Sequence, residues 1–133
     1  MIAYPSNVFA PDTRKPIEGG HVLVSRDGRA WLLVATFENE SQVTIEEYRE
    51  QLLTENYPDA ILDYAPFKKR SFVLSGTQGE THFYYRVNFT CAGKLINSWA
   101  LIYPVTERKF YDRVVEAVAR TYTPGAGRTG DCD

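Results

Sequence analysis

Residues 71–104 constrain the fold more than any other part of the chain, because they contain three strand patterns in a row. In the middle pattern two sets of side chains alternate between the faces of the predicted strand: Phe83, Tyr85, Val87, Phe89 and Cys91 against His82, Tyr84, Arg86, Asn88 and Thr90. A period of two, rich in aromatic and β-branched residues, is typical of a strand. The breaks at residues 76–79 and 92–93 are short, and short connections make neighbouring strands antiparallel. The sequence therefore predicts an antiparallel meander.

Further strands are predicted on both sides of this meander. Residues 21–25 and 30–37 flank Asp27-Gly28, and Asp-Gly between apolar runs favours a hairpin with a type I′ turn, which needs positive φ at both central residues. Residues 60–66 have a weaker strand pattern, which Pro66 restricts to a sheet edge or a bulge. The segment around Val8 and Phe9 could supply one more short strand.

Two helices are predicted to cover the sheet. Thr44 and Glu47 have the spacing of a capping box, in which each side chain bonds the backbone N–H of the other residue. This first helix ends before Pro58, since the residue before a proline avoids the helical region. The second helix is predicted to begin with Thr106 as its N-cap. Its buried stripe recurs at three- and four-residue steps: Tyr111, Val114, Val115, Val118 and Tyr122.

The order of these elements indicates an α+β fold, with a central antiparallel sheet of about six strands flanked by two helices. Runs of strands separated by helices favour this class over a parallel sheet, in which strands and helices alternate strictly. Strands that are almost continuously apolar need cover on both faces. At 133 residues the chain has the length of one domain. We place that domain at residues 1–124 and a glycine-rich tail at residues 125–133.

The two cysteines bear on the compartment in which the chain works. Cys91 ends the central strand and Cys132 lies in the tail. We expect a disulfide between them that tethers the tail, which favours the periplasm or the exterior of the cell. The alternative is a buried Cys91 that acts as a small apolar residue and a free Cys132. Residues 1–5 lack the basic start and apolar core of a leader. We therefore expect a removed leader, or else a cytosolic protein.

Composition and motifs argue against several classes of function. A net charge of −2 leaves no basic excess for nucleic acid, and no apolar run approaches the roughly 20 residues of a membrane span. Neither His21 nor His82 has a second histidine or a cysteine at ligand spacing, so no metal site and no cofactor are predicted. No serine lies in a motif of an activated nucleophile, so no catalytic residue is predicted.

Polar side chains on one face of the central strand are the candidate ligand contacts. His82, Tyr84, Arg86 and Asn88 share that face and could line a small polar pocket. The alternative reading is a polar face that is solvated or capped by a helix.

Five short segments, spread over nearly the whole chain, resemble segments of known proteins. They lie in turns, in strand cores and in the apolar stripe of a helix. The segments are Y-P-S-N-V-F (4–9), S-R-D-G-R-A (25–30), S-F-V-L-S-G (71–76), Y-P (103–104) and Y-D-R-V-V-E (111–116). Together they resemble a family of exported bacterial domains of unknown function, which are often appended to longer secreted proteins. The layout is similar to the PsbP/Mog1-like fold, an α/β/α sandwich. The resemblance implies a binding or assembly role and no catalytic residue.

From these observations we expect an exported, non-enzymatic domain that binds a protein partner or a small ligand. Two alternatives stay open. One is a small enzyme with a polar pocket around His82, Tyr84 and Arg86, and the other is a cytosolic adaptor of Mog1 type.

The expected disulfide yields a direct prediction. Peptide mapping without reduction should recover Cys91 linked to Cys132, and Cys132→Ser should lower the free energy of unfolding by up to about 4 kcal/mol, because the bridge closes a loop of roughly 40 residues. Two thiols that react with an alkylating reagent in the unreduced protein would contradict this prediction.

Overall fold

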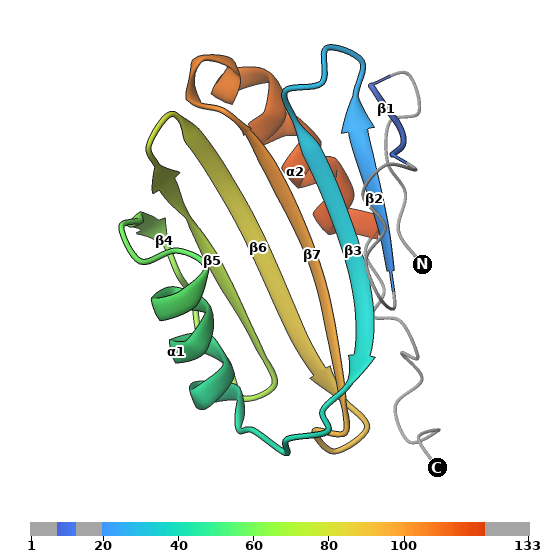
Figure 1. Ribbon diagram of the computed structural model, residues 1–133, viewed down its shortest axis with the longest axis vertical. Helices are drawn as coiled ribbons and strands as arrows, with labels where there is room; N and C mark the ends of the chain where they lie inside the picture. The colour runs from blue at the N-terminus through green and yellow to red at the C-terminus, as the bar shows by residue number, and fades with distance from the viewer. Residues whose placement is uncertain (1–7, 13–19, 122–133) are drawn as a thin grey trace.

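The computed structural model describes residues 8–12 and 20–121. Seven strands and two α-helices occupy these residues (Figure 1). Their bounds are β1 Phe9–Pro11, β2 Gly20–Ser25, β3 Trp31–Glu38, α1 Ile45–Glu55, β4 Ile61–Tyr64, β5 Ser71–Gln78, β6 Thr81–Thr90, β7 Leu95–Pro104, the 3₁₀ turn Val105–Glu107, and α2 Arg108–Thr121. The whole predicted tail (residues 125–133, with Cys132) and Tyr122 of the predicted helix stripe lie outside the described residues.

The strands form one sheet in the order β1-β2-β3-β7-β6-β5-β4, and each neighbouring pair of described strands is antiparallel. The predicted meander is confirmed as β5-β6-β7, which β4 extends at one edge. The sheet has one strand more than the predicted six, because β1 pairs along β2 at the other edge. Pro11 is tolerated in β1 because only one side of an edge strand bonds to a neighbour.

The side chains of β6 alternate between the two faces of the sheet, and each face carries its own hydrophobic core. On one face α2 packs over β2, β3 and β7, and on the other α1 packs over β5 and β6 (Figure 1). The α2 core contains Phe9, Leu23, Ala30, Leu32, Trp99, Leu101, Tyr103, Tyr111, Val114, Val115 and Val118. The α1 core contains Ile45, Leu52, Phe72, Leu74, Phe83, Val87, Phe89 and Ile96. The structure is thus the expected α/β/α sandwich.

The start of α1 is confirmed as a capping box. The Thr44 Oγ1 atom accepts from the backbone N–H of Glu47 at 3.1 Å, and the Glu47 carboxylate accepts from the Thr44 N–H at 2.8 Å. These two bonds satisfy backbone donors that the first turn of a helix leaves without partners.

Two local predictions are wrong. In the turn after β2 only Gly28 has positive φ, so the turn is not type I′: the loop is longer than two residues, and Asp27 instead accepts from the Ser25 hydroxyl and the Arg29 N–H. Thr106 is not an N-cap, because it lies inside the 3₁₀ turn that precedes α2. Positive φ at two successive non-glycine residues occurs instead after β6, at Cys91 and Ala92.

The attachment of β4 to the sheet depends on a glycine in β5. Gly76 is paired with Leu62, and a Cβ atom at Gly76 would collide with the carbonyl group of Ile61. The register of this pair also shifts between Leu62 and Tyr64, so β4 bulges at Asp63.

Gly76→Ala should therefore loosen β4. We expect a loss of about 1–3 kcal/mol in the free energy of unfolding, typical of overpacking, and faster amide hydrogen exchange in β4. Gly79→Ala is the matched control, because Gly79 has positive φ but no atom within 4 Å of the added methyl group. Gly79→Ala should lower the free energy of unfolding without a selective rise in the hydrogen exchange of the β4 amides. Unchanged β4 exchange in Gly76→Ala would contradict the prediction.

Candidate functional site

The predicted ligand-facing residues form one row along β6 on the side of α2. His82 is 1% exposed, while Tyr84, Arg86 and Asn88 are half-buried. The structure therefore brings the four residues onto one face, as the alternation predicts, but His82 lies beneath other side chains. Tyr84, Arg86 and Asn88 are the members of the row with surface available for contact.

Two hydroxyl groups from the adjacent strand β5 hold the His82 ring. The Ser75 Oγ atom lies 3.3 Å from His82 Nε2, and the Thr77 Oγ1 atom lies 3.2 Å from His82 Nδ1. A neutral imidazole donates through one nitrogen and accepts at the other. One hydroxyl group therefore accepts the ring N–H and the other donates to the ring, so both nitrogens are satisfied without a charge.

An ion-pair network from β4 and α2 closes over this histidine. The Asp63 Oδ2 atom lies 3.9 Å from His82 Nε2 and accepts from Arg108 Nη2 at 2.9 Å. Arg108 Nε also lies 3.4 Å from the Asp112 carboxylate, which accepts the Tyr103 hydroxyl at 2.7 Å. The network thus links an edge strand, a helix and the central strand β7.

Asp63, Arg108 and Asp112 were not predicted from the sequence as members of a site. Arg108 and Asp112 are four residues apart on α2, which is a recognisable ion-pair spacing. The contact between Asp63 and Arg108 joins residues far apart in the chain, and no local pattern could have revealed it.

The electrostatics of the cluster favour a neutral histidine. Burial lowers the pKa of His82, and the Arg108 guanidinium lowers it further, while Asp63 and Asp112 act in the opposite direction. Burial also raises the pKa of Tyr103, and the hydrogen bond to Asp112 adds to that effect. Both groups therefore stay uncharged near neutral pH, as buried groups that hydrogen-bond in their neutral forms should.

The geometry of Ser75, His82 and Asp63 differs from that of a catalytic triad. In a triad the carboxylate bonds the histidine nitrogen opposite the one that faces the serine. Here Ser75 and Asp63 both lie near Nε2, and Nδ1 faces Thr77. Ser75 is 6% exposed, so little of it can meet a substrate. The arrangement is suited to holding strands and helix together.

A second polar group continues along β6 beyond the histidine. Arg86 Nε donates to the Asn88 side-chain oxygen at 3.1 Å. Asn97, which is fully buried in β7, accepts from the Thr36 hydroxyl at 2.9 Å and donates to Thr90 Oγ1 at 2.8 Å. These bonds cross three adjacent strands, so the polar side chains fix the alignment of β3, β7 and β6 at this end of the sheet.

The apolar part of the row packs onto the α2 core. The Tyr84 ring stacks on Trp99, with ring centroids 5.2 Å apart and planes inclined by 29°. Burial raises the pKa of the Tyr84 hydroxyl. Tyr84 thus joins the polar row to the hydrophobic core.

The other expected features can be located in part. Within residues 8–12 and 20–121 there is no group of three or more acidic, histidine or cysteine side chains placed to hold a metal ion. None of the described helices has the length and apolar character needed to span a membrane. Cys91, just after β6, is not a free thiol, but its pairing with Cys132 stays a prediction because Cys132 lies outside the described residues.

The fold places the chain in the class of PsbP-like α/β/α sandwiches. A solved structure of cyanobacterial PsbP (CyanoP) from Synechocystis sp. PCC 6803 is similar to it, with a TM-score of 0.61 at 14% sequence identity over 92% of this chain and 84% of the other. At this identity the likeness shows the fold alone. The sequence matches no known family, and it matches no curated protein. The expected fold is therefore confirmed, while membership of an exported family stays a prediction.

The lowered pKa of His82 predicts acid sensitivity. Because the folded state binds this proton less readily than the unfolded state, the free energy of unfolding should fall as the pH drops below about 6.5, by up to about 1.4 kcal/mol per pH unit until the folded-state pKa is reached. His82→Gln should flatten this dependence.

The measurement is urea unfolding at a series of pH values between about 7 and 5. His21→Gln is the matched control, since it removes the exposed histidine of β2 and leaves the buried one. An identical pH dependence in His82→Gln and the parent chain would contradict the prediction.

Proposed function

We propose that this chain is a non-enzymatic domain of an exported protein and that it binds a protein partner or a small ligand. The observation that carries the proposal is the closed set of bonds around His82. Each polar group that an enzyme would use there is bonded to another group of the same cluster. A catalytic histidine must instead reach both a nucleophile and a substrate.

The row along β6 supports a binding role. Tyr84, Arg86 and Asn88 combine an aromatic ring, a cation and an amide on one sheet face, and they are only half-buried. A buried network beneath such side chains fixes their positions before a ligand arrives, which lowers the entropic cost of binding. These three residues are the proposed contacts, and His82 is a positioning residue.

The exported compartment is supported by the chemistry of Cys91. Cys91 is not a free thiol, and disulfides persist in the periplasm and outside the cell rather than in the cytosol. The PsbP-like fold by itself identifies neither a partner nor a reaction.

A substrate screen tests the proposal. The purified chain is assayed against panels of esters, phosphate esters and glycosides, with Ser75→Ala and His82→Gln as matched variants. We expect the parent chain and both variants to show the same rate as buffer. Turnover that is present in the parent and lost in folded Ser75→Ala would overturn the non-enzymatic proposal.

A further inference from the structure

Exposed apolar side chains gather in the segment that contains the edge strand β4. Five large hydrophobic residues of the described chain are exposed, and three of them lie within residues 61–67: Ile61 at 76%, Tyr64 at 56% and Phe67 at 44%. A strand that only had to pair with β5 could place polar residues at these positions. A concentration of apolar surface in one short segment indicates contact with another molecule.

The backbone of this segment offers an edge for pairing. Among the described strands β4 bonds only to β5, so its outer side carries backbone groups without a strand partner. The Pro66 carbonyl accepts from the Val73 N–H, so Pro66 faces β5 and its missing N–H does not interrupt the outer side. The bulge at Asp63 and the four-residue length of β4 limit pairing to a short stretch.

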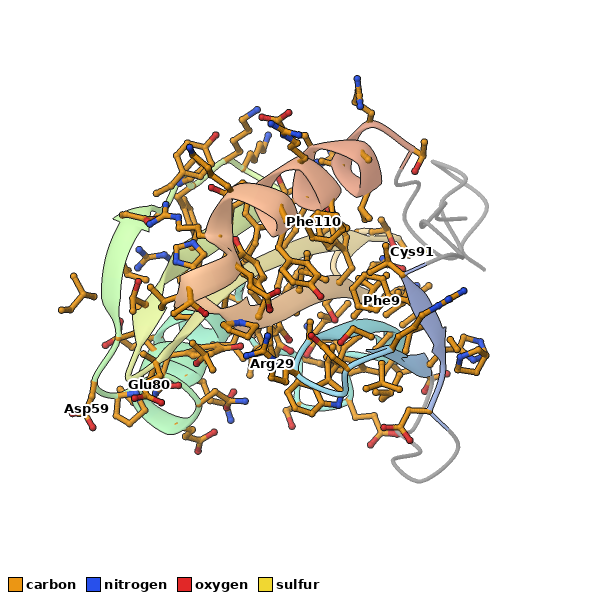
Figure 2. All side chains as sticks on the ribbon, turned by 90° about the horizontal axis from the view of Figure 1, so that it is seen from above. Phe9, Arg29, Asp59, Glu80, Cys91 and Phe110 are labelled. Atoms are coloured by element: carbon orange, nitrogen blue, oxygen red, sulfur yellow. The ribbon has the colours of Figure 1, made fainter. Side chains whose placement is uncertain are left out.

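The charges at the two ends of the segment are opposite. Asp59 and Glu80 lie at the end where β5 turns into β6, and Figure 2 labels both at the same corner of the molecule. The exposed cations at the other end are Lys68, Lys69 and Arg70. None of these five side chains forms an ion pair with another described residue.

The charges along this segment are complementary to those of a second copy that runs in the opposite direction. An antiparallel pairing of two β4 strands about a two-fold axis places the acidic end of each copy opposite the basic end of the other. It also brings Ile61, Tyr64 and Phe67 of the two copies together in the middle. A two-fold contact uses each edge once, so the assembly closes and does not extend into a fibre.

We infer that two copies of this chain associate edge to edge through β4, with the strands antiparallel. The charges and the apolar residues that support this contact lie outside the His82 cluster, so the inference is independent of the proposed function. Because the paired stretch is short and the ion pairs are exposed, the dimer should dissociate on dilution and weaken at high salt.

Sedimentation velocity over a series of protein concentrations is the test. The parent chain should shift from monomer to dimer as its concentration rises. Ile61→Lys should raise the dissociation constant about tenfold or more. In the antiparallel contact the new lysine would face the basic end of the other copy, where Lys68 and Lys69 lie, and like charges repel each other. Ile61 is 76% exposed, so the variant should fold normally. Phe110→Lys is the matched control, an exposed apolar residue on α2 that should leave association unchanged.

Charge reversal tests the antiparallel geometry. Asp59→Lys/Glu80→Lys makes both ends basic, and Lys68→Glu/Lys69→Glu makes both ends acidic. Each variant alone should be monomeric at concentrations where the parent dimerises, and an equimolar mixture should restore the dimer. A parent chain that stays monomeric at every concentration would overturn the inference. So would a dimer that survives Ile61→Lys, or a mixture that remains monomeric while both variants are folded.

Discussion

The pairing of β7 with strands on both of its sides is the constraint on which the rest of the structure depends. β3 bonds along one side of β7 and β6 along the other, so β7 joins the N-terminal strands to the meander. Ile96, Trp99 and Leu101 of β7 are at most 2% exposed and contribute to both cores. Backbone groups buried between two layers have no water to replace a lost partner, so a break in this ladder would leave them unsatisfied.

The polar cluster around His82 follows from this arrangement. β7 leads through the 3₁₀ turn Val105–Glu107 into α2, which folds back over the sheet and brings Arg108 close to His82 at the start of β6. There Arg108 meets Asp63 of the edge strand, and Tyr103 of β7 meets Asp112. Hydrogen bonds within such a network offset the cost of burying its polar groups, provided that every member is satisfied. His82 is thus buried within the fold, and its imidazole stays neutral.

The parts of the fold that depend on local patterns were accessible from the sequence. The alternation in β6 predicted both faces of the sheet, and the spacing of Thr44 and Glu47 predicted the start of α1. Features set by distant partners were not accessible. Asp63 became part of the cluster only because the first residue of α2, Arg108, reaches it across the sheet. Gln42, Cys91 and Ala92 adopt positive φ although none of them is a glycine. The row along β6 was predicted, but the burial of His82 depends on side chains from β4 and α2.

The order in which the strands are joined also bears on how the chain reaches this structure. The hairpin β2-β3 and the run of strands from β4 to β7 each contain strands that are close in sequence, so the pairing within each of them is local. Pairing of β3 with β7 brings together residues from opposite halves of the chain, such as Trp31 and Ile102. Closing so long a loop carries an entropic cost that is met before any contact is gained, so we expect this docking to be the slow step of folding. Strand edges that have not yet paired are prone to aggregate, so we expect the folding chain to be most vulnerable before β3 and β7 meet.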